Sequence, residues 1–319
     1  MGKHLSIALR NPASVQELFG ANDDNVSVFE DLMGVRIFFR GNQIFLDTTD
    51  EEVKRRFEEL LMRLEEHLRL GQLPGPDLIR AVHNALQTGQ PENIDLLKNY
   101  SVVVPNGLAK VFPRSHNQAL YLRAMETREL VFGIGPAGTG KTYLAVAQAL
   151  KAVQNRVKRK LILTRPVVEA GESLGYLPGD LEQKINPYLR PLYDAMEALL
   201  PIETIRRMEE NRVIEIAPLA YMRGRTLSDC FIILDEAQNT TKEQMKMFLT
   251  RIGEGSRAVV TGDITQIDLP RKENSGLLNV MRILKSIQEL EFVFLGEQDV
   301  VRNPLVRRIV RAYEEDDAN

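Results

Sequence analysis

The sequence predicts an α/β protein whose parallel sheet is preceded by a smaller α+β domain. Three observations support this prediction. Between about residues 130 and 296, six short apolar runs alternate with helical stretches, which is the rhythm of a parallel sheet covered by helices. A glycine-rich turn at 135–142 joins the first of these runs to a helical pattern. Residues 1–89 show instead a hairpin pattern followed by amphipathic helices.

Composition is typical of a globular protein with two domains. The 319 residues are 44% hydrophobic and 27% charged, which fits neither a disordered chain nor a membrane protein. The formal net charge of −3 gives no overall attraction to nucleic acid, so a polyanion site would have to be local. The single cysteine, Cys230, and the four scattered histidines lack metal-ligand spacing. With no secretory leader in the sequence, we expect a cytoplasmic protein without membrane contact.

The first domain, residues 1–89, is predicted from a hairpin and two helices. In the segment 35–47, "VRIFFRGNQIFLD", apolar and polar residues alternate on both sides of a turn. Thr49 and Glu52 have the spacing of a capping box, which predicts the start of a long helix. Pro76 indicates the first turn of a second helix, because a proline there sacrifices only an N–H that would be unpaired anyway.

Residues 90–113 are predicted to be a connector with one short strand, "SVVV", and residues 114–319 to form the larger domain. The sheet of this domain is predicted from apolar runs of strand length separated by helical patterns. These runs are "LVFGI", "KLILTRP", "RVIEIAP", "CFIILDE", "RAVVTGD" and "LEFVFLG". The acidic end, "EEDDAN", is predicted to be a solvated tail.

The stretch "GPAGTGKT" matches the phosphate-binding loop pattern G-x-x-x-x-G-K-[ST] and lies between a predicted strand and a predicted helix. Glycines allow such a loop to turn its backbone N–H groups around a phosphate chain, and the helix N-terminus adds partial positive charge. We expect Lys141 to bind the β and γ phosphates and the Thr142 hydroxyl to coordinate Mg²⁺. The predicted nucleotide-binding residues of the loop are Gly135, Pro136, Ala137, Gly138, Thr139, Gly140, Lys141 and Thr142.

A second motif, "FIILDEAQN", discriminates between the reactions that such a loop supports. Four apolar residues deliver Asp235 to a strand end, where its carboxylate can join Thr142 in holding Mg²⁺. Glu236 follows directly and can polarise a water for in-line attack. Because a kinase must present an acceptor rather than activate water, the motif favours hydrolysis of a nucleoside triphosphate. We therefore expect Lys141 and Glu236 to be catalytic.

Polar residues in two further segments are candidate nucleotide contacts. In "VVTGDITQIDLP", Thr261, Asp263 and Gln266 follow another apolar run, where they could face the γ phosphate; turn chemistry explains them equally well. Upstream of the first strand of the larger domain, Gln118 in "NQALYL" carries an amide that can pair with the edge of adenine. A single amide at that place is also common on a helix surface, so both interpretations stay open.

Together these motifs resemble the PhoH-like ATPases, relatives of superfamily 1 helicases. The likeness runs from "NQALYL" to "QDVVRNPLVRRIVRAY" and covers nearly all of residues 114–313, with "RPVVEAGESLGYLPGD" as its most family-specific part. The resemblance implies a P-loop NTPase core, ATP as the nucleotide, ATP hydrolysis and a role in RNA metabolism. It also implies that residues 1–89 are the KH-like domain of members without an added nuclease domain, the YbeZ type.

The sequence leaves the RNA-contacting surface open. KH domains clamp RNA with a G-x-x-G loop, whereas this chain has "FGANDDN", in which Asp23 and Asp24 would repel phosphates. A protein-binding or RNA-independent role for the first domain is therefore an alternative. Basic groups elsewhere are candidate RNA contacts, although most such groups are solvated helix faces. They are Arg156 to Lys160, Arg165, Arg223, Arg225, Arg307, Arg308 and Arg311.

The leading hypothesis is an ATP-driven enzyme that remodels or processes RNA, for example in rRNA maturation. The alternative is a slow ATPase that switches its grip on a partner, either an endoribonuclease of the YbeY type or the ribosome; a kinase is a distant third. Arg302 follows the last predicted strand and is a candidate arginine finger supplied in trans, and the resemblance favours a homo-oligomeric, hexameric ring. An ion pair of Arg302 with Glu297 or Asp299 is the structural alternative.

Overall fold

The computed structural model describes residues 5–8, 13–20, 23–41, 43–87, 91–108, 110–166 and 181–300. By their internal contacts the residues form two units. The first comprises residues 1–101 and 112–119, and the second comprises residues 102–111 and 120–319. Each unit has a hydrophobic core of its own.

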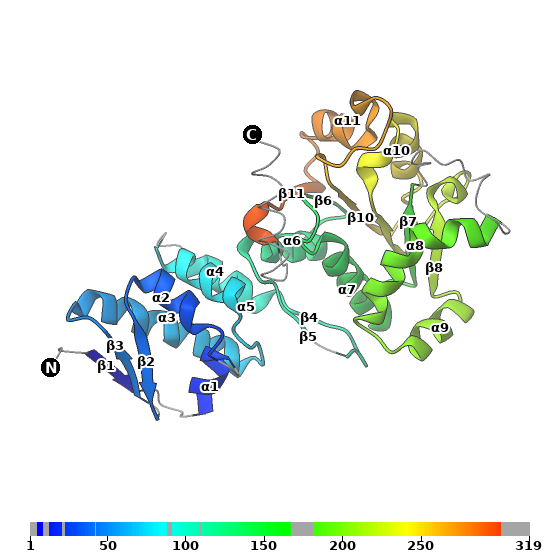
Figure 1. Cartoon of the computed structure of the whole chain (residues 1–319). Helices are drawn as coiled ribbons and strands as arrows, with labels where there is room; N and C mark the ends of the chain where they lie inside the picture. Colours follow the sequence, from blue (N-terminus) through cyan, green and yellow to red (C-terminus); the bar gives the residue numbers. More distant parts are fainter. Residues whose placement is uncertain are drawn as a thin grey trace. The chain divides into compact units, whose positions relative to one another are not determined.

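The first unit contains a three-stranded antiparallel sheet in the order β1-β3-β2 (Figure 1). Its strands are β1 (Leu5–Ala8), β2 (Ile37–Arg40) and β3 (Gln43–Leu46). Strands β2 and β3 form the predicted hairpin, with Phe38 opposite Phe45. Ile37 and Ile44 point into the core while Phe38, on the opposite face, is 42% exposed. The hairpin predicted from the alternation in the sequence is confirmed.

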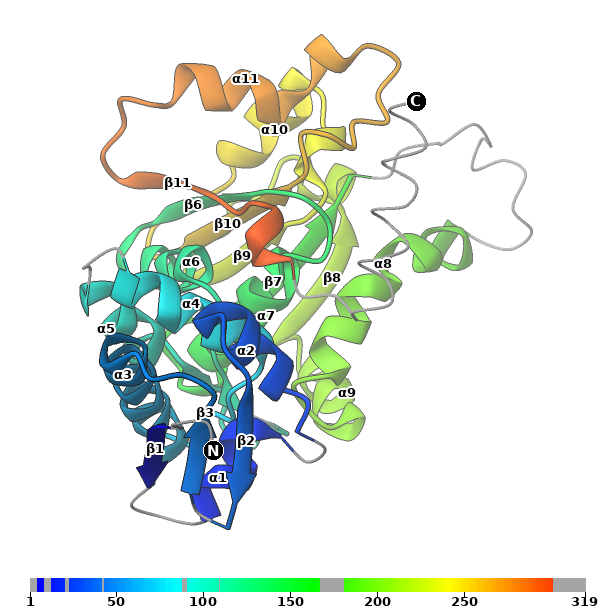
Figure 2. The same ribbon diagram turned by 60° about the vertical axis from the view of Figure 1, so that its left-hand side comes forward.

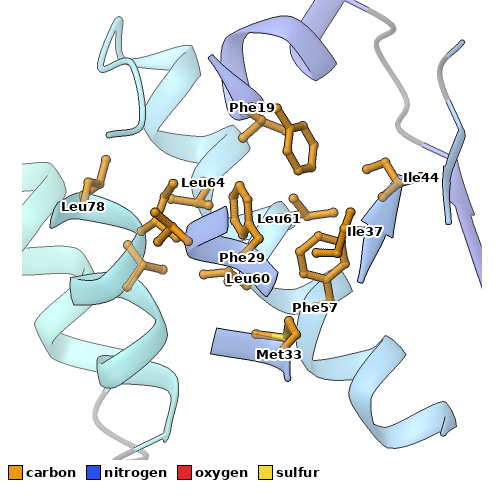
Figure 3. Close-up of a cluster of buried hydrophobic side chains, with 14 of the residues drawn as sticks. Phe19, Phe29, Met33, Ile37, Ile44, Phe57, Leu60, Leu61, Leu64 and Leu78 are labelled. Carbon is orange, nitrogen blue, oxygen red and sulfur yellow. The ribbon is translucent and has the colours of Figure 1, made fainter. Parts of the chain in front are cut away.

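The helices of this unit share one hydrophobic core with the buried face of the sheet. They are α1 (Ala13–Phe19), α2 (Val26–Met33), α3 (Glu51–Arg69), α4 (Pro76–Gln87) and α5 (Pro91–Asn99). Figure 3 shows part of their shared core, in which Phe29 of α2 and Phe57 of α3 meet edge to face with 5.6 Å between ring centroids. Both rings are fully buried, so they supply a large share of the apolar area that stabilises this unit.

Two local predictions differ from the structure. Helix α3 is capped by Asp50 rather than Thr49, because the Asp50 carboxylate accepts a hydrogen bond from the Glu52 backbone N–H at 2.8 Å. The segment predicted to be a connector with one strand contains helix α5 and two paired strands, β4 (Val102–Val103) and β5 (Lys110–Val111). Ile94 and Leu97, three residues apart on one face of α5, are buried in the core of the first unit.

The second unit is built on a six-stranded sheet in the order β11-β6-β10-β9-β7-β8, in which every neighbouring pair is parallel. Its strands are β6 (Leu130–Ile134), β7 (Lys160–Arg165), β8 (Ile214–Pro218), β9 (Cys230–Leu234), β10 (Arg257–Gly262) and β11 (Leu290–Phe294). Each of the predicted apolar runs forms one of these strands. The predicted α/β fold with a parallel sheet is confirmed.

Helices cover both faces of this sheet (Figures 1 and 2). Helix α7 packs against β7, β9 and β10 on one face, and on the other face Phe248 of α10 and Leu277 of α11 share a core with Ile232. The helices are α6 (His116–Thr127), α7 (Lys141–Gln154), α8 (Leu181–Glu197), α9 (Ile202–Glu210), α10 (Lys242–Leu249) and α11 (Gly276–Ile283), with short 3-10 turns η2 (Leu219–Met222), η3 (Ala237–Asn239), η4 (Lys272–Asn274) and η5 (Glu297–Asp299). No helix among the described residues is both long and apolar enough to cross a membrane.

The parallel arrangement brings the carboxyl ends of the strands to one edge of the sheet. Strand β10 lies between β6 and β9, so the segments that follow Ile134, Leu234 and Gly262 emerge side by side. Strand β7 flanks β9 and ends in register with it, at Arg165. Ligands of open α/β sheets bind outside this edge, which is where the predicted phosphate loop and acidic pair lie.

Candidate functional site

The loop between β6 and α7 has the backbone geometry of an anion cradle. Gly140, the residue before α7, has a φ of +79°, a left-handed conformation that favours glycine. Gly135 lies against the backbone of Leu295, where any Cβ would collide with the Leu295 carbonyl. These glycines let the loop turn tightly into the first turn of α7, whose N–H groups lack intrahelical partners. Ala137 and Gly138 at the loop tip are exposed to solvent.

Lys141 lies folded back over the loop. Its Nζ donates hydrogen bonds to the carbonyl oxygens of Gly135 at 2.6 Å and Pro136 at 2.8 Å, and the Thr139 hydroxyl donates to Pro136 at 2.9 Å. Burial lowers the pKa of Lys141, and nearby carboxylates, Asp263 foremost, offset part of this shift. A phosphate group entering the loop would offer the ammonium a charged acceptor in place of two neutral carbonyls, which is the stronger interaction.

Asp235 accepts hydrogen bonds that link the segment after β9 to the start of α7 and to the end of β10. Its Oδ1 accepts hydrogen bonds from the hydroxyl of Thr142 at 2.7 Å and from that of Thr261, at the end of β10, at 2.6 Å. Since Thr142 uses its only hydrogen on Asp235, its oxygen lone pairs are available to a cation. Proteins hold Mg²⁺ with one or two side chains together with phosphates and water, and Thr142 and Asp235 could supply two such oxygen ligands.

Glu236 is held at both carboxylate oxygens. Its Oε2 accepts a hydrogen bond from Gln238 Nε2 at 2.6 Å, and its Oε1 lies 3.0 Å from Nη2 of Arg165. The Glu236 backbone has a φ of +54°, which is uncommon for a residue other than glycine. Gln238 in turn accepts the backbone N–H of Asp263 at 3.0 Å. The predicted base is thus tied into the loops that follow β7, β9 and β10.

Arg165 lies beside the acidic pair, a place that the sequence did not predict for it. Its Nε lies 3.2 Å from Oδ2 of Asp235, as an ion pair whose N–H is not aligned for a hydrogen bond. Nη1 donates to the Tyr188 carbonyl on α8 at 2.7 Å. The sequence indicated only a basic residue at a strand end, and we placed it among candidate RNA contacts. The pairing of β7 with β9 brings it to the acidic pair instead.

Arg225, another predicted RNA contact, also forms an ion pair within the fold. Arg225 pairs with Glu215 through both of its terminal nitrogens, at 2.5 and 2.9 Å, and Lys160 joins the same carboxylate at 2.5 Å. Hydrogen bonds from Arg225, then from Lys160, overcome the opposing effect of burial and lower the pKa of Glu215 to about 2. With Arg165, three of the basic groups predicted to contact RNA therefore already have an acidic partner within the fold.

The predicted nucleotide contacts Asp263 and Gln266 lie in the segment after β10. Asp263 is buried, and its Oδ1 accepts both the backbone N–H of Thr265 at 2.9 Å and the Thr265 hydroxyl at 2.6 Å. Its Oδ2 is buried without a hydrogen-bond partner among the described residues. Gln266 is exposed and donates its backbone N–H to the Asp263 carbonyl at 3.1 Å. Turn chemistry thus accounts for one oxygen of Asp263, while contact of either side chain with a γ phosphate stays a prediction.

Of the two remaining candidates, Gln118 is among the described residues and Arg302 is not. Gln118 belongs to the first unit, where its side-chain oxygen accepts the Arg114 backbone N–H at 2.7 Å near the start of α6. That contact neither requires nor excludes a nucleotide, so its predicted adenine contact stays a prediction. Arg302, Arg307, Arg308 and Arg311 lie beyond the described residues, and so does the family-specific segment after Pro166.

Comparison with known proteins gives closely similar relatives. A family model described as PhoH-like protein matches residues 110–314. A PhoH-like protein of Bacillus subtilis is 46% identical over 307 residues, which is 96% of each chain. One of Synechocystis is 44% identical over 309 residues, covering 97% of this chain and 94% of the relative. Protein PhoH of Escherichia coli K12 is 42% identical over 236 residues, or 73% of this chain and 65% of the relative. Among solved structures, the Pif1 helicase of Candida albicans matches with a TM-score of 0.31 at 17% identity, covering 57% of this chain and 40% of that chain.

Proposed function

Because this chain belongs to the PhoH-like protein family and has a P-loop NTPase core, we propose that it binds ATP with Mg²⁺ and hydrolyses it. The observation that carries this proposal is the Thr142–Asp235 hydrogen bond of 2.7 Å. It joins the end of the phosphate loop to the end of strand β9, and so sets the two predicted metal ligands beside each other before any nucleotide is bound. Such preorganisation avoids reorganisation during the reaction.

Binding of the triphosphate draws on groups that already face the loop. Lys141 exchanges the carbonyls of Gly135 and Pro136 for the β and γ phosphates, and the N–H groups at the start of α7 bind phosphate oxygens. Thr142 and Asp235 are the residues that would hold Mg²⁺, which when bound neutralises charge on the phosphates. Thr261 keeps Asp235 oriented through its 2.6 Å hydrogen bond.

Glu236 orients the attacking water and takes its proton. It is the carboxylate next to the metal ligand, and its side chain is 38% exposed, whereas that of Asp235 is 4% exposed. A base has to reach both the water and the γ phosphate, which the more exposed carboxylate can do. Arg165 and Gln238 hold its two oxygens in one orientation, so the carboxylate has to turn from them to face the water. Proton transfer to Glu236 and attack on phosphorus then release ADP and inorganic phosphate.

We further propose that this ATPase acts in RNA metabolism, by remodelling or processing RNA. The sequence resemblance supports this role, together with the KH-like character predicted for the first unit. The alternative is a regulatory switch with slow hydrolysis that grips a protein partner or the ribosome while ATP is bound. In either case a homo-oligomer, with a hexameric ring favoured, would let Arg302 of one copy complete the site of the next.

Steady-state ATPase assays with and without single-stranded RNA test the proposal and separate its two forms. The wild type should hydrolyse ATP, and Lys141→Ala should not, because the loop then lacks the charge that binds the γ phosphate. Strong stimulation by RNA with strand displacement supports the remodelling enzyme. Weak, unstimulated turnover with ATP-dependent capture of a purified endoribonuclease or ribosome supports the switch. Transfer of labelled phosphate to a protein or nucleoside instead of water would point to a kinase.

A further inference from the structure

One cation serves both carboxylates of the hydrolytic pair. Arg165 lies 3.2 Å from Asp235 and 3.0 Å from Glu236, and its side chain is only 16% exposed. A third contact, the 2.7 Å hydrogen bond to the Tyr188 carbonyl, anchors the same guanidinium to α8. A planar guanidinium that is fixed at three points keeps its orientation, so Arg165 also fixes the carboxylates that it touches.

This arrangement is unsuited to activating water. Glu236 has Arg165 at one oxygen and Gln238 at the other, so donors fix the direction of the whole carboxylate. A general base has to aim a lone pair at the water and gain a proton in the transition state. As it stands in the structure, Glu236 is in a resting position.

The ion pairs of Arg165 with Asp235 and with Glu236 differ in their exposure to solvent. Asp235 is 4% exposed and keeps its ion pair in a largely dry environment, whereas Glu236 is 38% exposed and water screens its pair with Arg165. If Glu236 turns away, Arg165 still has Asp235 and the Tyr188 carbonyl as partners, and no cation is left buried and unpaired. The ion pair with Glu236 is therefore the one that Arg165 can lose at a small cost in free energy.

We propose that Arg165 is a positioning residue that restrains the ATPase: it holds Glu236 in the resting position, and hydrolysis begins when Glu236 exchanges Arg165 for the attacking water. This inference rests on the proposed ATP hydrolysis and adds a restraint on its rate. We call this restraint, the hold of Arg165 on Glu236, the brake. The exchange breaks no covalent bond and needs no further reactant. Its cost is added to the barrier for hydrolysis in every turnover, so removing Arg165 lowers that barrier.

Three variants test the brake. At saturating ATP, Arg165→Ala should raise kcat about fivefold, the upper range for a partly exposed ion pair, with little change in KM. Arg165→Lys keeps the charge but not the planar pair of N–H donors, so its kcat should lie between those of Arg165→Ala and the wild type. Arg190→Ala is the matched control, because Arg190 is an exposed arginine of α8 that pairs with Asp194 outside the site. Its turnover should equal that of the wild type.

Affinity for Mn²⁺·ADP, followed by electron paramagnetic resonance, gives a second readout that needs no turnover. Without Arg165 the two carboxylates lack their compensating charge, so Arg165→Ala should bind Mn²⁺·ADP severalfold more tightly, whereas Arg165→Lys and Arg190→Ala should match the wild type. Adding Glu236→Gln to Arg165→Ala should abolish the gain in turnover, because that gain acts through Glu236. Unfolding curves of each variant identify any that fails to fold, and Arg165→Lys then carries the test.

The turnover of Arg165→Ala either supports or overturns the proposed restraint by Arg165. A loss of turnover in folded Arg165→Ala would mean that Arg165 stabilises the transition state, and unchanged turnover would mean that it imposes no restraint; both overturn the brake. If neither the wild type nor Arg165→Ala hydrolyses ATP although both bind Mn²⁺·ADP, the proposed function fails. A wild type that hydrolyses ATP without any gain in the variant leaves the function intact and refutes the brake alone.

Discussion

Substitution of Thr261 tests whether its hydrogen bond orients Asp235 in the site. Its side chain is fully buried at the end of β10, and its hydroxyl donates to Oδ1 of Asp235 at 2.6 Å. Thr261→Val keeps nearly the same shape and removes only this donor. Asp235 would keep the Thr142 hydroxyl and Arg165 as partners, so the carboxylate stays partly satisfied but loses the contact that fixes it from the β10 side.

The expected loss follows from the kind of bond removed. A hydrogen bond to a charged group contributes about 1.5–3 kcal/mol. Because two partners of Asp235 remain, we expect the lower end, about 1.5 kcal/mol, in the free energy of unfolding. The same misorientation of Asp235 should lower kcat/KM for ATP about tenfold, since 1.4 kcal/mol corresponds to a factor of ten. Thr261→Ser keeps the hydroxyl and should retain most of both quantities.

Urea unfolding followed by circular dichroism, together with ATP titrations in a coupled ATPase assay, measures the two effects on the same samples. The reasoning is wrong if the valine and serine variants have equal kcat/KM, because the hydroxyl would then not be what orients Asp235. If the valine variant loses stability alone, the bond serves the fold and not the reaction.

Three further predictions concern other parts of the chain. Burial lowers the pKa of both His67 and His83, so below about pH 6.5 the unfolded chain binds protons that the folded chain does not. The free energy of unfolding should therefore fall as the pH drops from 7.5 to 5, by up to about 1.4 kcal/mol per pH unit for the buried His67 and by less for the partly exposed His83. His67→Phe should reduce that slope in urea titrations. Gln118→Ala should reduce discrimination between ATP and GTP by about 1–3 kcal/mol, as measured by competition binding, and equal use of both nucleotides by the wild type would remove the basis for this assignment. Mixtures of Arg302→Ala and Lys141→Ala subunits should regain partial ATPase activity if Arg302 acts in trans, whereas mixtures that stay inactive despite confirmed co-assembly would contradict this.

The sheet of the second unit could be predicted because buried parallel strands are apolar on both faces. Strand β9, "CFIIL", is buried at every position, and so it reads in the sequence as one continuous apolar run. The phosphate loop was equally visible, since its glycines are required by the backbone. Both features depend on residues that are neighbours in the chain.

Contacts between distant segments could not be predicted in the same way. Arg165 is 70 residues before Asp235 in the sequence, and only the order of strands in the sheet places β7 beside β9. Nothing in a single arginine at a strand end distinguishes a solvated group from a partner of the acidic pair. The displaced cap of α3 has a different cause: Thr49 and Asp50 are adjacent residues that can both cap a helix, and spacing alone does not choose between them.

The nucleotide that the protein retains shows whether this site hydrolyses ATP with Glu236 as the base. Wild type, Glu236→Gln and Lys141→Ala are mixed with ATP and Mg²⁺, freed of unbound nucleotide by rapid gel filtration, and the bound nucleotide is identified by chromatography. We expect ADP on the wild type, intact ATP on Glu236→Gln with hydrolysis slowed about 10²-fold or more, and little nucleotide on Lys141→Ala. Hydrolysis by Glu236→Gln at the wild-type rate would contradict this expectation.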